Sequence, residues 1–182
     1  MRAPRFRMTS PFREGGSVFP SYDTLLDRPV VLRRLGPGKE AEWTADVRRR
    51  VKTSTATART PVIHDLVEID RTWWIVEEHV HGRSLAEFTG IGTLGEKVDA
   101  VEDALGDLAE LHGSGHAHGA PDISKVLLNA HRGAATLVGA QPPAVDLAAA
   151  QRADLRQFGA SARRVLIGGA DAGDAATRNG NE

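Results

Sequence analysis

The stretch His118-Gly119-Ala120-Pro121-Asp122-Ile123-Ser124-Lys125-Val126-Leu127-Leu128-Asn129 indicates how the second half of this chain is organised. It follows a run of helical character that ends at Leu108-Ala109-Glu110-Leu111-His112, and Gly113-Ser114-Gly115 separates the two. The closing Val126-Leu127-Leu128 predicts a short buried strand. A helix, a glycine turn, a polar loop and a strand in this order predict a loop displayed at the mouth of a cleft.

The same stretch resembles the catalytic loop of bacterial serine/threonine protein kinases, whose pattern is His-Arg-Asp-(apolar)-Lys-Pro-x-Asn-(apolar)-Leu-Leu. His118 and the apolar run 126–128 are in register with this pattern. The chemical positions differ, because Ala120 stands at the catalytic aspartate, Asp122 at the lysine and Lys125 at the metal-binding asparagine. The resemblance implies the frame of a kinase site without its catalytic groups.

Composition excludes several other classes of function. The 182 residues are enough for one medium domain or two small lobes, and the net charge of −1 gives no electrostatic case for nucleic acid or an anionic membrane. No run of apolar residues is long enough for a membrane span, so we expect a soluble, cytoplasmic protein. The chain has no cysteine, which excludes disulfides, thiol catalysis and cysteine-ligated zinc.

The N-terminal segment alternates apolar and polar residues from Phe6 to Tyr22 around Gly15 and Gly16, which predicts two strands joined by a glycine turn. An ordinary hairpin turn explains this pair of glycines. The resemblance instead implies a shortened version of the loop that covers the nucleotide phosphates. It also implies that Arg33 occupies the place of the phosphate-pairing lysine, whereas the residue pattern alone is consistent with a solvated strand end.

Residues 40–52 are polar and compatible with a helix, and the resemblance places there the helix whose glutamate pairs with the third-strand lysine. The expected position falls near Arg48, which would repel Arg33; a change in loop length would bring Asp46 there instead. The following Thr53-Ser54-Thr55-Ala56-Thr57 is either a polar connector or an acceptor of phosphate from another kinase.

The clearest strand pair is 62–68 with 73–78, joined by a turn at 69–72. With residues 79–88 it resembles the kinase segment that runs through the hinge, and Gly82-Arg83-Ser84-Leu85-Ala86 is typical of actinobacterial members. The resemblance implies that the Glu78 carbonyl and the Val80 N–H face an adenine edge. Glu77 then occupies a position that is usually apolar, where a carboxylate needs a partner or water.

Residues 94–112 predict a helix with one apolar face. The residues of that face are Val98, Val101, Leu105, Leu108 and Leu111. The nearby His112, His116 and His118 suggest a zinc site by their spacing, but two of them match kinase positions used for packing and loop structure. We therefore predict no metal site.

Beyond the loop, the register of the resemblance puts Gly139 at the metal-binding aspartate and reduces the activation segment to residues 142–147. Asp154 matches an aspartate that braces the catalytic-loop backbone in kinases; a helix N-terminal acid is the alternative reading. The resemblance ends near Ile167, and residues 169–182 have the composition of a disordered tail.

Together these features predict an α+β, protein-kinase-like two-lobe fold. The expected domains are a small β-rich N-lobe ending in the hinge (1–80), a truncated helical C-lobe (81–168) and a disordered tail (169–182). The expected function is a catalytically inactive pseudokinase that serves as a regulatory or scaffolding binding module. The alternatives are a residual ATP-binding serine/threonine kinase in which Asp122 acts as the base, and a decaying gene product.

Three expectations about ligands follow. ATP binding, through Gly15, Gly16, Arg33, Glu78 and Val80, is expected to be weak and independent of magnesium. The C-lobe is expected to bind a protein, either a kinase or a second copy, because its last helix supplies apolar residues that lack a cover. These residues are Leu155, Phe158, Val165, Leu166 and Ile167. A return of residues 142–150 over that surface is the competing account.

Overall fold

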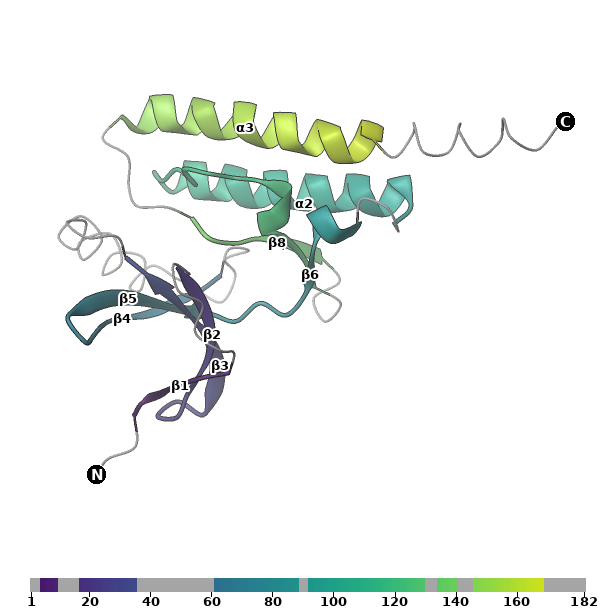
Figure 1. Cartoon of the computed structure of the whole chain (residues 1–182). Helices are drawn as coiled ribbons and strands as arrows, with labels where there is room; N and C mark the ends of the chain where they lie inside the picture. Colours follow the sequence, from purple (N-terminus) through teal and green to yellow (C-terminus); the bar gives the residue numbers. More distant parts are fainter. Residues whose placement is uncertain are drawn as a thin grey trace, which may run out of the picture. The chain divides into compact units, whose positions relative to one another are not determined.

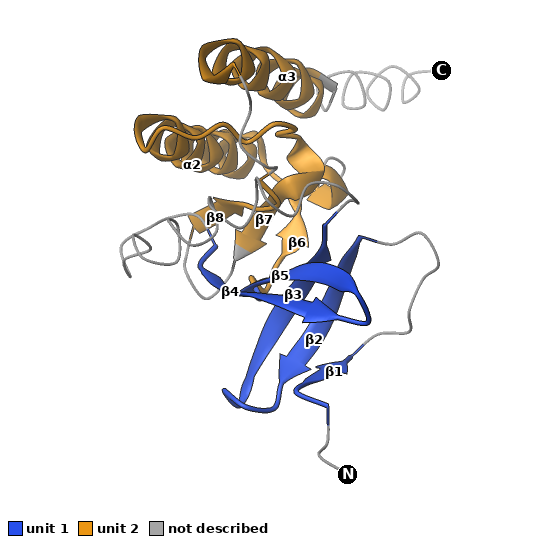
Figure 2. Ribbon diagram, turned by 90° about the vertical axis from the view of Figure 1, so that its left-hand side faces the viewer, with its two compact units in different colours: residues 1–79 blue, residues 80–182 orange. Residues whose placement is uncertain are grey.

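A computed structural model of the chain describes residues 4–9, 17–35, 61–88, 92–129, 134–140 and 146–168. The chain divides into two compact units, Met1–His79 and Val80–Glu182 (Figure 2). The predicted helix at 40–52, the hydroxyl-rich run 53–57 and the predicted tail 169–182 lie outside the described residues.

Unit 1 contains a five-stranded antiparallel sheet (Figure 1). Its strands are β1 (Phe6–Met8), β2 (Val18–Asp23), β3 (Arg28–Arg34), β4 (Ile63–Ile69) and β5 (Thr72–Glu78), in the spatial order β1-β2-β3-β5-β4. The predicted strand pair in the middle of the sequence is confirmed as the β4–β5 hairpin. Asp70 and Arg71 make its turn with φ values of 50° and 60°, as the twist of a two-residue hairpin requires.

Both faces of this sheet carry apolar clusters, because successive side chains of a strand point to opposite faces. On one side Phe19, Leu32 and Trp74 pack together, with the rings of Phe19 and Trp74 edge to face at 5.6 Å. On the other side a smaller cluster contains Ile63 and Ile75. In β5, which lies between β3 and β4, three consecutive residues are therefore buried, and the strand does not alternate strictly between apolar and polar residues.

Unit 2 combines a small sheet with two long helices (Figure 1). Its elements are β6 (Arg83–Ser84), the 3-10 helix η1 (Leu85–Phe88), α2 (Leu94–Gly113), the 3-10 helix η2 (Ile123–Lys125), β7 (Val126–Asn129), β8 (Ala134–Leu137) and α3 (Leu147–Gly168). The sheet order is β6-β7-β8, antiparallel throughout. Gly82 precedes β6 at a point where an added Cβ would collide with the Leu128 carbonyl oxygen, so the close approach of the two strands requires glycine.

The helix α2 begins with a capping box. The Thr93 hydroxyl accepts a hydrogen bond from the Glu96 N–H at 3.2 Å, and the Glu96 carboxylate accepts one from the Thr93 N–H at 2.8 Å. These two bonds satisfy backbone groups that the first turn of a helix leaves unpaired.

The predicted apolar face of α2 is correct at Val101, Leu108 and Leu111, which are buried, and wrong at Leu105, which is 41% exposed. The centre of the buried face carries Ala100 and Ala104 instead. Leu105 lies at the edge of this face, about a quarter turn away from its centre at 3.6 residues per turn. The small side chains at the centre allow the strands and α3 to approach α2 closely.

Two carboxylates of α2 hold the edge strand β8. Asp103 accepts a hydrogen bond from the Ala135 N–H at 2.9 Å, and Asp107 accepts one from the Leu137 N–H at 2.8 Å. Because β8 ends the sheet, these amides have no neighbouring strand to pair with. The side chains of α2 thus complete the hydrogen bonding of the sheet on which the helix packs.

The helix α3 packs along α2, and their shared core contains Leu108, Phe158 and Val165. The sequence prediction that Phe158 and Val165 lack a cover is wrong, because both are buried, at 0% and 1% exposure, against their own chain. Leu155 and Ile167 are exposed, as expected. The helix also begins at Leu147, so residues 147–150 are helical and do not return over this surface.

Among the described residues, no helix combines the length and the apolar character needed to cross a lipid bilayer.

Candidate functional site

In unit 2, the loop that follows α2 is held by Asp154 of α3. One carboxylate oxygen of Asp154 accepts a hydrogen bond from the His118 N–H at 2.6 Å, and the other accepts one from the Gly119 N–H at 2.8 Å. Asp154 is 1% exposed. It stands in the second turn of α3 or beyond, since the helix begins at Leu147, so the alternative reading as a helix N-terminal acid is not supported. The brace that the resemblance implied is present.

Two further side chains fix the same loop to the helices. His112 Nε2 donates a hydrogen bond to Asp154 at 3.0 Å, which orients the carboxylate. The Gln151 amide donates to the carbonyl oxygens of His112 and His116 at 3.0 and 2.9 Å. The end of α2, the turn at 114–115 and the start of α3 are therefore joined by one hydrogen-bond network that the sequence pattern did not reveal.

The side chain of His118 faces inward at 1% exposure. Its Nε2 donates a hydrogen bond to the Val138 carbonyl oxygen at 3.0 Å, and its Nδ1 accepts one from the Ala120 N–H at 3.4 Å. Both bonds select the tautomer with the proton on Nε2. His118 thereby ties the loop to the end of β8, immediately before Gly139.

Ala120, Lys125 and Gly139, which stand at the base and the two metal-ligand positions of the resemblance, lie together. The Lys125 ammonium donates a hydrogen bond to the Ala120 carbonyl oxygen at 2.6 Å. A Cβ added at Gly139 would lie 3.8 Å from Lys125 Cδ, so the lysine stem runs beside this glycine. Gly139 has φ of +80°, where a residue with a side chain would be strained. The place that carboxylates fill in the kinase pattern here holds a cation.

Asp122 caps the short helix η2. Its carboxylate accepts a hydrogen bond from the Ser124 N–H at 2.9 Å. This bond lowers the pKa of Asp122 below its ordinary value; burial opposes the shift, and the charges of Arg164 and Lys125 add to it. A carboxylate that is a hydrogen-bonded cap with a lowered pKa is a poor general base at neutral pH.

In unit 1, the described partner of Arg33 is Glu77. The Arg33 guanidinium donates two hydrogen bonds to the Glu77 carboxylate, one from Nε at 3.2 Å and a shorter one from a terminal nitrogen. Both side chains are largely buried, at 8% and 12% exposure. Arg33 is paired with Ile75 in the β3–β5 register, and Glu77 with Val31, so the two residues are diagonal neighbours on one face of the sheet. From the sequence, the Glu77 carboxylate was expected to need a partner. That partner is Arg33, the cation that was predicted to contact phosphate.

The other residues that were predicted to bind ATP lie at the end of unit 1, at the start of unit 2 or outside the described residues. Glu78 ends β5, and its N–H and carboxylate bond the Val62 carbonyl oxygen and N–H at 2.8 and 3.2 Å. Val80 begins unit 2 and is 8% exposed. Gly15 and Gly16 lie outside the described residues, as do Asp46 and Arg48.

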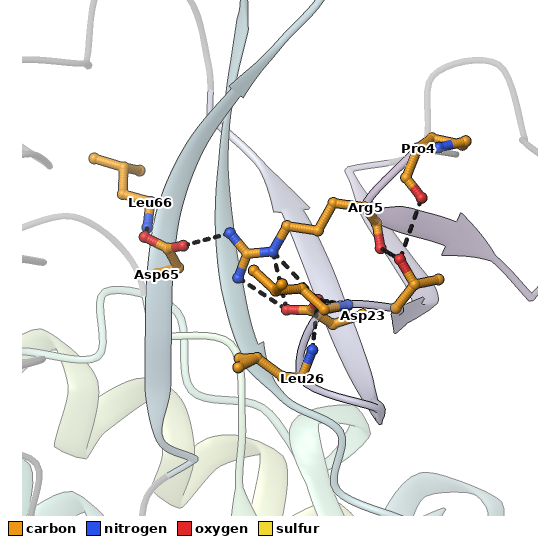
Figure 3. Close-up of polar contacts among 8 residues, drawn as sticks. Pro4, Arg5, Asp23, Leu26, Asp65 and Leu66 are labelled. Carbon is orange, nitrogen blue, oxygen red and sulfur yellow. Dashed lines mark hydrogen bonds and ion pairs between the residues drawn. The ribbon is translucent and has the colours of Figure 1, made fainter. Parts of the chain in front are cut away.

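A second polar cluster in unit 1 was not predicted (Figure 3). The Arg5 guanidinium donates hydrogen bonds to Asp23 at 2.9 Å and to Asp65 at 2.8 Å, while Asp23 also accepts from the Leu25 and Leu26 N–H groups at 3.0 and 3.3 Å. Three segments far apart in sequence meet here: the approach to β1, the β2–β3 turn and β4. Nothing in the local pattern around Arg5 indicates this long-range role.

The three histidines considered as zinc ligands have other contacts. His112 bonds Asp154, His118 bonds Val138, and His116 Nδ1 lies 3.2 Å from the Ser114 hydroxyl. Among the described residues there is no group of three or more histidine, aspartate or glutamate side chains arranged to hold a metal ion.

The strand order of unit 1 and the helix, loop and strand arrangement of unit 2 define an α+β, protein-kinase-like fold. Among solved structures, the chain is similar to Rad53 1–466 in complex with AMP-PNP, with a TM-score of 0.71 at 12% sequence identity. The match covers 90% of this chain and 48% of that one, so this chain spans about half the length of that structure. At this identity the similarity establishes the fold alone. No protein-family model matches the sequence, and no curated protein matches it either.

Proposed function

We propose that this chain is a binding module of regulatory or scaffolding type that descends from the bacterial serine/threonine kinases and does not transfer phosphate. The hydrogen bond from the Lys125 ammonium to the Ala120 carbonyl oxygen, beside Gly139, carries this proposal. Phosphoryl transfer depends on positioning and on neutralising the charge of metal-bound phosphates. A resident ammonium repels a divalent cation from the same place, and alanine offers no group that can accept a proton.

The environment of Asp122 supports the same conclusion. Phosphoryl transfer by this chain would need Asp122 as the base, because Ala120 holds the usual position. Its carboxylate is engaged by the Ser124 N–H, and its pKa is lowered. Freeing it for catalysis would uncap η2, at a cost of about 1 kcal/mol.

For the nucleotide, we propose weak ATP binding that does not depend on magnesium. Arg33 is the cation predicted to meet phosphate, and in the free protein its guanidinium is bonded to Glu77. Phosphate would have to compete with this buried carboxylate for the same donors. ATP binding is therefore expected to be weak at this position.

Two measurements on the full chain test the proposal. With labelled ATP and either magnesium or manganese, the protein should label neither itself nor a basic substrate. ATP should produce at most a small melting shift, and the shift should be the same with and without magnesium. Stoichiometric labelling that is abolished by Asp122→Asn would overturn the proposal, as would a melting shift that requires magnesium.

A designed variant tests the specific role of Lys125. The double substitution Ala120→Asp/Lys125→Asn restores a carboxylate at the base position and an amide oxygen at one metal-ligand position, and it removes the ammonium. This variant should gain a magnesium-dependent melting shift with ATP. The control is Arg34→Asn, which removes an exposed cation and should leave the melting shift with ATP the same as in the wild type, with and without magnesium. Lys97→Asn is unsuitable as a control because Lys97 is buried.

A further inference from the structure

The two long helices of unit 2 carry opposite charges on their exposed surfaces. The exposed charged side chains of α2 are all acidic: Glu96, Asp99, Glu102 and Glu110. Those of α3 are all arginines: Arg152, Arg156, Arg163 and Arg164. The charges of opposite sign on each helix, Lys97 and Asp154, are both buried. Each helix therefore presents charge of a single sign to solvent.

On each helix the charges are gathered on one side. At 3.6 residues per turn, Arg152, Arg156 and Arg163 lie within about 40° of one another around the axis of α3, and Asp99, Glu102 and Glu110 within about 80° around α2. Within the described ranges these six side chains make no hydrogen bond or ion pair. The arginines of α3 are turned away from the core residues Phe158 and Val165, so they do not reach the acids of α2 in the same molecule.

Both helices also carry exposed aliphatic side chains. On α3, Leu155 and Ile167 are 53% and 52% exposed, and on α2, Leu94 and Leu105 are 61% and 41% exposed. At about 1.5 Å rise per residue the first pair is about 18 Å apart and the second about 17 Å. Leu155 and Ile167 flank the arginines within about 80° around α3, whereas Leu94 and Leu105 lie about 100° or more from the centre of the acids around α2, so the match between the two helix faces is one of charge.

We propose that the α3 face of one molecule, formed by Arg152, Arg156 and Arg163, docks on the α2 face of a second copy, formed by Asp99, Glu102 and Glu110. The charge complementarity of the two faces selects another copy of this chain as the partner. The net charge of −1 leaves little overall repulsion to oppose association.

This contact is heterologous, because it joins two different surfaces. Such a contact leaves a free α3 face at one end and a free α2 face at the other, so it generates rings or open chains rather than a closed dimer. The inference gives the proposed binding module one partner. It does not depend on whether the chain transfers phosphate, which the labelling experiment measures separately.

The experiment is sedimentation of the full chain at tens of micromolar. Association is expected at about 20 mM salt and is expected to be largely lost at about 500 mM, where exposed charges are screened. Arg156→Glu/Arg163→Glu makes the α3 face acidic, and Asp99→Arg/Glu102→Arg makes the α2 face basic. Each double variant alone should associate at least about tenfold more weakly than the wild type.

Mixing the two double variants supplies the decisive comparison. The mixture contains an unaltered basic α3 face and an unaltered acidic α2 face on different molecules, so association should return in the mixture. Arg7→Glu/Arg34→Glu changes the net charge by the same amount and sign as the α3 double variant, at exposed positions of unit 1, and should leave association unchanged. Circular dichroism of each variant verifies folding.

A wild-type protein that stays monomeric at low salt would overturn the proposal, and so would association that survives both double variants. Polyglutamate binding to the monomer is measured in parallel. If the monomer binds polyglutamate and Arg156→Glu/Arg163→Glu abolishes this binding, the α3 face binds an acidic partner and the proposed self-association is wrong.

Discussion

Arg33 of β3 and Glu77 of β5 form an ion pair across the sheet of unit 1, diagonal to the direct cross-strand register. Both side chains are largely buried, and the guanidinium contacts the carboxylate through two nitrogens. The pair joins two departures from the kinase pattern, an arginine in place of the third-strand lysine and a glutamate in a usually apolar position. The buried charge of each residue is thus paired with the buried charge of the other.

This pairing predicts how the two residues contribute to stability. Glu77→Leu and Arg33→Met should each lower the free energy of unfolding by about 3 kcal/mol, because each leaves a buried charge without its described partner. The double variant Arg33→Met/Glu77→Leu should be more stable than either single variant. Urea unfolding measures all three. Glu68→Gln, at an exposed position of the same sheet, serves as the control and should change stability by no more than about 0.5 kcal/mol. Strictly additive losses in the double variant would contradict the pairing.

The bracing carboxylate of Asp154 gives a second prediction. Asp154→Asn keeps the size of the side chain but replaces one acceptor oxygen by a donor, which then faces a backbone N–H. The free energy of unfolding should fall by about 2 kcal/mol, the range for hydrogen bonds to a charged group. Hydrogen exchange should become faster at the amides of His118 and Gly119.

The matched control for this substitution is Asp99→Asn on the exposed face of α2, which should leave both quantities unchanged. Unchanged exchange at His118 and Gly119 in Asp154→Asn would show that the brace does not hold the loop.

Acid sensitivity is predicted from the Arg5 cluster. Burial acts to raise the pKa of Asp23, but the hydrogen bonds from Arg5 and from the Leu25 and Leu26 amides outweigh it and hold this pKa below its ordinary value. The folded state therefore binds the proton more weakly than the unfolded state does. The resulting stability is present above about pH 4 and is lost as the pH falls through the folded pKa.

Removing Arg5 should abolish this loss, because burial then dominates at Asp23 and the folded state no longer binds the proton more weakly than the unfolded state does. We expect the melting temperature of Arg5→Met to lie below that of the wild type at about pH 6, and the difference to shrink as the pH falls to about 2, because only the wild type loses this contribution. Arg7→Met removes a neighbouring exposed arginine and should follow the wild-type curve. Identical pH profiles for Arg5→Met and the wild type would exclude this linkage.

Two positions of α3 separate the core of unit 2 from its surface. Phe158→Ala should lower the free energy of unfolding by about 3–5 kcal/mol, because Phe158 is fully buried against α2. Leu155→Ala should change it by no more than about 0.5 kcal/mol, because more than half of this side chain is exposed. Chemical denaturation of dilute protein measures both. A large loss at Leu155 under these conditions would contradict its position on the surface of α3.

Local patterns were enough to predict the strands of unit 1, the helix α2 and the strand β7, and the resemblance to the kinase family predicted the protein-kinase-like fold.

The predicted elements have a common basis. These features depend on interactions of short range along the chain: the alternation of 62–68 and 73–78, the three- and four-residue spacing in 94–112, and the apolar run 126–128. The role of Asp154 was also predicted, because an ordered series of weak matches placed it in register with a known brace.

The tertiary structure alone decided which side chains meet. No local pattern pairs Arg33 with Glu77, or Arg5 with Asp23 and Asp65, because the order of strands in the sheet sets these contacts. The burial of Phe158, the exposure of Leu105 and the bond from Lys125 to Ala120 were likewise beyond sequence reasoning. Hydrophobic periodicity records that a residue belongs to an apolar or polar face, whereas packing between distant segments determines what that face touches.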